Sequence, residues 1–177
     1  GWTDLTQADG HHRLRFSPDN RFYLDTYSRA DLPPVTELRK TSDGSLVTVV
    51  EKADISALLK TGWTVPERFV AKGRDGKTDI HGLIFRPIGF DPGRKYRVIE
   101  HIYAGPHDHH VPKAFNPSPY GQPMAELGFI LVKIDGMGTN WRSKEFHDVC
   151  WKNLGDSGFP DRIAWIKAAA AKYPAMD

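Results

Sequence analysis

Tyr103 is the residue whose type and position best suit chemistry. A short apolar run, residues 97–103, ends at this tyrosine, and Gly105-Pro106 follow directly. The pattern predicts a buried strand that stops in a sharp turn. In open α/β sheets, sites form at the carboxyl ends of strands, where a phenol can donate a hydrogen bond to an oxyanion. Taken alone, the run is explained more simply by a core tyrosine with a locally bonded hydroxyl.

A polar run comes next in the chain, residues 107–110, with the sequence HDHH. Histidines beside a carboxylate suit zinc or iron, but four adjacent residues cannot converge on one ion without distant ligands. We therefore expect a polar loop at the mouth of a cleft rather than a metal site. The pair His11-His12 is expected at the edge of a β-sheet for the same reason.

Other familiar motifs are incomplete. Residues 135–139 (DGMGT) lack the third glycine of a dinucleotide loop and the GK[ST] of a P-loop, so a tight turn at the end of a strand is expected. Ser118, Ser143 and Ser157 lie in no G-x-S-x-G elbow. The single cysteine, Cys150, excludes an internal disulfide and is expected to be a structural thiol. Read alone, the chain has no complete catalytic apparatus.

Composition limits the class of protein. The 177 residues fit one large domain or parts of two, with 40% hydrophobic residues and no run long enough to cross a membrane. The net charge of +2 comes from 24 basic and 22 acidic residues, which are intermingled, so nothing suggests a nucleic-acid surface. No signal peptide opens the chain, yet Gly1 is not a natural start, and the cellular compartment stays open.

The elements that would position Tyr103 fall into two parts. Up to about residue 51, alternating polar and apolar residues separated by turns predict four short antiparallel strands, at residues 12–16, 21–27, 35–39 and 45–51. Such a set matches one blade of a β-propeller, which cannot bury both of its faces alone. A short helix is expected at residues 53–60, and Pro66 marks a domain border.

After Pro66 the pattern changes to that of an α/β unit. Strands are expected at residues 68–72, 80–86, 97–103 and 129–135, and helices at residues 122–127 and 162–172. In the last helix, Ile163, Ile166 and Ala170 share a face, with Trp165 alongside.

Six motifs in order carry a resemblance to a known family: YAGP at 103–106, ELGF at 126–129, DGMGT at 135–139, FHD at 146–148, LG at 154–155 and Asp161. The chain resembles the prolyl oligopeptidase family, most closely its dipeptidyl peptidase IV branch of serine peptidases, over nearly all residues after Pro66. One departure is Met137, where the family's turn usually has arginine.

The resemblance implies an α/β fold: a partial α/β-hydrolase sheet in residues 67–177, preceded by the end of a β-propeller and a linker in residues 1–66. It implies that Tyr103 helps to form the oxyanion hole of an enzyme acting on peptides, with no cofactor or metal. It places the catalytic triad beyond Asp177 and the residues that grip the substrate's amino terminus before Gly1, so the chain alone should be inactive. It also implies that a further polypeptide segment or a second copy covers the edge formed by residues 97–103.

Two other functions stay open at this point. A non-catalytic relative could use the same architecture for binding, and another α/β-hydrolase could act as an esterase. The presence of G-x-S-x-G followed by Asp and His would indicate an enzyme. A substrate panel would separate a peptidase from an esterase.

Overall fold

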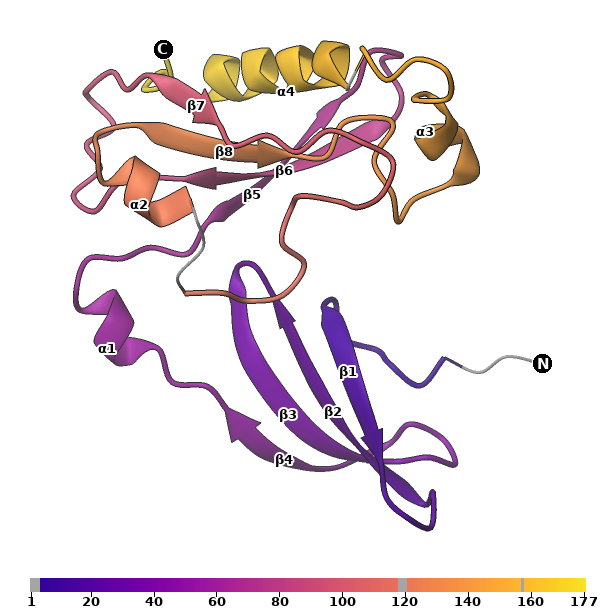
Figure 1. Cartoon of the computed structure of the whole chain (residues 1–177). Helices are drawn as coiled ribbons and strands as arrows, with labels where there is room; N and C mark the ends of the chain where they lie inside the picture. Colours follow the sequence, from indigo (N-terminus) through magenta and orange to yellow (C-terminus); the bar gives the residue numbers. More distant parts are fainter. Residues whose placement is uncertain (1–3, 118–120, 157) are drawn as a thin grey trace. The chain divides into compact units, whose positions relative to one another are not determined.

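The structure, a computed structural model, describes residues 4–117, 121–156 and 158–177. It contains two compact units, whose elements are labelled in Figure 1. The first consists of Gly1–Thr61 and Pro112–Pro117, and the second of Gly62–Val111 and Ser118–Asp177. The first holds an antiparallel sheet and the second a mixed sheet.

The first unit is built on a four-stranded sheet in the order β1-β2-β3-β4. Its strands are β1 (His11–Phe16), β2 (Phe22–Arg29), β3 (Leu32–Lys40) and β4 (Leu46–Lys52). All four strands predicted from the alternation are present. β3 begins earlier than predicted and includes Pro33 and Pro34, which a strand tolerates at its start. The expected helix at 53–60 shrinks to one turn, α1 (Ser56–Leu59).

Polar side chains tie this sheet together. Tyr23 is buried and donates its hydroxyl to the carbonyl of Leu5 at 2.6 Å. His12 lies on the edge strand β1, as expected, with Nδ1 2.8 Å from the buried Asp25 carboxylate and Nε2 2.8 Å from the Ala8 carbonyl oxygen. Burial opposes the charge on His12, but Ala8 and Asp25 together raise its pKa. This histidine is therefore a structural group.

The second unit contains a four-stranded mixed sheet in the order β5-β6-β8-β7. Its strands are β5 (Glu67–Lys72), β6 (Asp79–Phe85), β7 (Val98–Glu100) and β8 (Ile130–Ile134). β6 pairs antiparallel with both β5 and β8, while β7 runs parallel to β8. All five residues of β8 are buried, the four apolar ones as expected and Lys133 with them.

Strand β7 is shorter than the predicted strand at 97–103. The His101 N–H still donates to the Val132 carbonyl at 3.0 Å, after which the chain leaves the sheet. The chain therefore departs from the sheet several residues before the turn at Gly105-Pro106. Near the start of β7, Tyr96 exchanges hydrogen bonds with Ala175 and Asp177, which run parallel to it.

Three helices accompany this sheet: α2 (Gly121–Ala125), α3 (Lys144–Asp148) and α4 (Phe159–Lys172). The sequence did not predict α3, because five residues show too little periodicity; its signal is Ser143, whose hydroxyl accepts from the Phe146 N–H at 3.2 Å. Helix α4 begins at Phe159, ahead of the predicted residue 162, with a proline in its first turn. No helix within the described residues is long and apolar enough to span a membrane.

The buried face of α4 agrees with the predicted one except at Ile163, since Trp165, Ile166 and Ala170 all pack in or against the core. Ile163 is 52% exposed, whereas Trp165 and Ala169 are fully buried. Trp165 packs over β6 where Gly82 leaves room: a Cβ there would lie 2.5 Å from Trp165 Cζ2. The prediction counted only apolar residues, and it missed that Asp161 and Arg162 are buried as well.

Candidate active site at the end of β7

Tyr103 lines a cavity of about 370 Å³ in the second unit. It lies three residues beyond the end of β7, and its side chain is partly buried. The cavity is lined by two loops, at residues 103–107 and 137–139, and by two residues of the segment that follows α3. Its lining consists of Tyr103, Ala104, Gly105, Pro106, His107, Met137, Gly138, Thr139, Cys150 and Leu154.

The loop that carries Tyr103 folds back over its phenol. A Cβ built on Gly105 would lie 3.7 Å from the Tyr103 hydroxyl oxygen, so this glycine leaves the hydroxyl uncovered on that side. After Gly105, the carbonyl oxygen of Pro106 lies 3.0 Å from Nε2 of His147 on α3. The loop is thus held at both ends, by the sheet and by α3.

The opposite loop, residues 136–139, is held by hydrogen bonds and close packing. The Gly138 N–H donates to the Phe146 carbonyl at 2.8 Å, and the Thr139 hydroxyl donates to the Gly136 carbonyl at 3.0 Å. A Cβ on Gly136 would lie 2.9 Å from the Gly158 carbonyl oxygen. Gly138 has φ +102° and approaches Cys150. These contacts account for both glycines as parts of a tight turn, as the sequence predicted.

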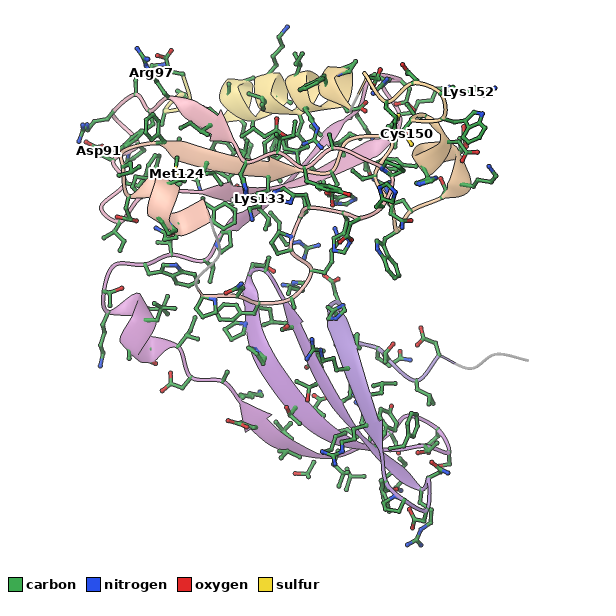
Figure 2. The ribbon with its side chains drawn as sticks, in the orientation of Figure 1. Asp91, Arg97, Met124, Lys133, Cys150 and Lys152 are labelled. Atoms are coloured by element: carbon green, nitrogen blue, oxygen red, sulfur yellow. The ribbon has the colours of Figure 1, made fainter. Side chains whose placement is uncertain are left out.

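Cys150 forms part of the cavity wall. Its Sγ lies 3.1 Å from the His147 carbonyl oxygen, and its side chain is half-buried. The thiol is free of any disulfide. Its position beside α3 is labelled in Figure 2.

Behind the cavity lies a residue that the sequence analysis missed. Arg162 is 1% exposed and sits in the first turn of α4. Its guanidinium donates to the Glu100 carboxylate at the end of β7, to the Ile134 carbonyl at the end of β8 (2.7 Å) and to the Tyr103 carbonyl (2.7 Å). Burial raises the pKa of Glu100, and Arg162 opposes that rise. One side chain therefore joins two strand ends to the Tyr103 backbone.

Its neighbour Asp161 holds the facing loop. This fully buried carboxylate accepts from the Met137 N–H at 3.0 Å and from the side chain and backbone of Arg74. Arg74 also forms an ion pair with Asp156, lowering the pKa of that carboxyl. The only hint of this arrangement in the sequence is an acid–base pair at the start of an amphipathic helix.

The HDHH run is an exposed to half-buried polar loop, and His107 lines the cavity. The N–H groups of His110 and Val111 both donate to Asp135 Oδ1, at 2.6 and 3.0 Å. His110 Nε2 lies 3.3 Å from His101 Nδ1. Burial lowers the pKa of Lys133, which Figure 2 labels on β8. Within the described residues, no three histidine, cysteine or acidic side chains gather as a metal would require.

Of the three serines considered as nucleophiles, the structure describes only Ser143. Ser143 caps α3, as described above. Ser118 and Ser157 lie outside the described residues. The structure thus brings Tyr103 together with the 135–139 turn and Cys150, while His12 belongs to the other unit.

Comparison with known proteins yields matches along the whole chain. Residues 118–177 match the prolyl oligopeptidase family. The chain is 30% identical to a probable dipeptidyl-aminopeptidase B of Emericella nidulans over 96% of its length, and 28% identical to human dipeptidyl peptidase 8 over 99%. The crystal structure of Porphyromonas gingivalis dipeptidyl peptidase 4 is similar over 99% of this chain, with a TM-score of 0.76 and 26% identity.

These relatives are much longer than the 177 residues compared. The chain covers 19% and 20% of the two curated relatives and 25% of the solved chain. The matches nevertheless extend through both units and agree with the ordered motifs from YAGP to Asp161. Residues 118–177 thus match the prolyl oligopeptidase family, and the chain as a whole is similar to dipeptidyl peptidases.

Proposed function

We propose that the protein containing this chain is a serine peptidase that hydrolyses peptides by acyl transfer, and that Tyr103 donates a hydrogen bond to the oxyanion. The observation that carries the proposal is the position of Tyr103, which lines a cavity just beyond a sheet strand in a chain similar to dipeptidyl peptidases over its whole length. A preorganised donor of this kind lowers the barrier because negative charge develops on oxygen in the tetrahedral intermediate.

The same proposal assigns the two segments on either side of Pro66 a place in the family's architecture. Residues 1–66 form the last blade of a β-propeller and a linker, which is supported by four antiparallel strands in sequential order. Residues 67–177 form the first part of an α/β-hydrolase domain, which is supported by an antiparallel start followed by the parallel pair β7 and β8. The nucleophilic serine, its histidine and its acid then lie outside these residues.

Two kinds of partner follow from the proposal. Peptides are the substrates, in keeping with the names of the relatives. Further polypeptide pairs with the outer edge of residues 97–103 beyond Val98, whose N–H already donates to the Asp177 carbonyl at 3.3 Å. The support is that β7 is the last strand in its sheet order and residues 98–100 are only partly buried. No cofactor is invoked.

Replacing Tyr103 with Phe in the complete protein tests the proposal. We expect kcat to fall by roughly one to three orders of magnitude with little change in KM, because the donor acts in the transition state. The readout is steady-state hydrolysis of dipeptide anilides, with esters assayed in parallel. Tyr173→Phe is a matched control, because its phenol bonds Glu67 and does not line the cavity.

Each outcome has a distinct meaning. An unchanged kcat in Tyr103→Phe would return Tyr103 to the role of a core aromatic. Hydrolysis of esters but not of anilides would replace the peptidase with an esterase. If the complete protein hydrolyses neither, it is a non-catalytic binding protein.

A further inference from the structure

Arg162 occupies an unfavourable position for a cation. It lies in the first turn of α4, where the helix dipole favours negative charge, and it is 1% exposed. A buried charge of this kind persists only when paired and hydrogen-bonded. The hydrogen bonds of Arg162 therefore account for its burial. They are made at the carboxyl ends of β7 and β8, next to Tyr103.

These contacts join the parts of the structure that position Tyr103. The guanidinium donates to the carboxylate of Glu100, the last residue of β7, and to the carbonyl of Ile134, the last residue of β8. Its other terminal nitrogen donates to the Tyr103 carbonyl at 2.7 Å. His101 still bonds Val132 of β8, but residues 102–104 belong to no helix or strand, so the bond from Arg162 fixes a stretch that the sheet no longer holds.

We propose that Arg162 is a positioning residue for Tyr103: its planar guanidinium holds the backbone beyond β7, so that the phenol faces the cavity in one orientation. The inference rests on the proposed function, because it gives Arg162 a role in forming the oxyanion hole. A lysine cannot reproduce the role, since its single ammonium lacks the fixed fork that reaches three separate acceptors. Asp161 holds the facing loop through Met137, so consecutive residues of α4 secure both walls.

The decisive variant is Arg162→Lys in the complete protein. It keeps a positive charge near Glu100 and avoids the large cost of leaving a buried carboxylate unpaired. We expect kcat to fall about tenfold to a hundredfold with KM little changed, as a misplaced catalytic donor would cause. Arg86→Lys is the matched control, because Arg86 pairs with Glu67 and lines no part of the cavity.

A double variant separates positioning from general damage. If Arg162 acts through Tyr103, adding Arg162→Lys to Tyr103→Phe lowers kcat by less than about twofold further, because the phenol hydroxyl is already absent. If Arg162 is only structural, its effect persists in full in the Tyr103→Phe background. That additive result would overturn the proposal.

A second measurement does not depend on activity. With ¹³C-labelled tyrosine, the ring signal of Tyr103 can be assigned by its loss in Tyr103→Phe. We expect this signal to shift or split in Arg162→Lys and to stay in place in Arg86→Lys. An unmoved signal would contradict the inference even in an active enzyme. A wild-type protein that cleaves no substrate would refute the proposed function, while the NMR comparison would still decide the role of Arg162.

Discussion

At His110, several neighbours act on one imidazole. Burial, followed by Lys133 and His101, lowers its pKa to about 4, against the opposing effect of Asp135; Arg162 lowers it as well. At neutral pH the ring is therefore uncharged. Its contact with His101 is a hydrogen bond between neutral rings, in which one nitrogen donates and the other accepts.

This depressed pKa predicts an acid-sensitive stability. In the unfolded chain a histidine titrates near pH 6.5. Between pH 6.5 and 4 the unfolded state consequently binds more protons at this residue than the folded state does. The free energy of unfolding should fall as the pH drops through this window, by roughly 2 kcal/mol after allowance for partial exposure, and should not depend on His110 above it.

Urea unfolding at a series of pH values measures this loss. His110→Gln should flatten the decline relative to the wild type, whereas the exposed His107 changed to Gln should leave it as it is. Identical slopes for wild type and His110→Gln would show that His110 does not cause the acid sensitivity.

Sequence reasoning reached some of these residues and missed others for a physical reason. Tyr103 could be found because a strand end and a Gly-Pro turn are local patterns, although its role came from resemblance. Arg162 could not be found, because its partners Glu100 and Ile134 lie 62 and 28 residues away in the chain. A helix pattern alone gives no reason to bury an arginine.

At the level of elements, the packing of α4 on β6 depends on a glycine, Gly82, which has no side chain. Trp165 is fully buried, donates its indole N–H to the Phe69 carbonyl at 3.2 Å and meets the Phe69 ring edge-on. Gly82 provides the space for that indole. A glycine normally weakens a strand, so this one is retained for the close approach of the helix.

Gly82→Ala should therefore destabilise the protein. The added Cβ would lie 2.5 Å from Trp165 Cζ2 and 2.8 Å from the Lys133 carbonyl oxygen, so helix or strand must move. Overpacking of this kind costs about 1–3 kcal/mol, which a shift of the urea midpoint would reveal. Gly155→Ala is the control, because no atom lies within 4 Å of its added Cβ. Equal stability of the two variants would contradict the packing argument.

Helices and strands could be predicted best where their apolar residues recur at a regular spacing. The four strands of the first unit follow from alternation, and β8 follows from its apolar run. Helix α3 is too short to show a period, and the length of β7 depends on where the chain turns away. On α4 the predicted face holds except at Ile163, and the burial of the ion-paired Asp161 and Arg162 was missed because their partners are distant in the sequence.

At the scale of the molecule, the sequence placed a border near Pro66. The compact units instead divide between Thr61 and Gly62, and residues 112–117 belong to the first unit. There the Phe115 N–H donates to the Ser28 hydroxyl at 3.1 Å. Such a return of the chain depends on contacts between distant residues, and no local pattern announces it.

The chain expressed alone should be catalytically silent. It contains no G-x-S-x-G elbow, so we expect no specific labelling by a fluorophosphonate probe and no cleavage of dipeptide anilides. The complete protein, treated in parallel, should react. Labelling of Ser118, Ser143 or Ser157 in the chain alone, if abolished by heat denaturation, would refute the assignment of the nucleophile to residues outside it.

The buried indole of α4 also gives the chain an optical signal of its own folding. Trp165 is sealed between helix and sheet, whereas Trp141 and Trp151 are each 74% exposed. Iodide in solution quenches the fluorescence of the two exposed tryptophans first. The blue-shifted emission of the buried tryptophans remains. Trp63 is also buried, at 4% exposure, so the part of the remaining light that is lost in Trp165→Phe belongs to α4. That part reddens when α4 leaves the sheet, so it follows the detachment of the helix that carries Arg162.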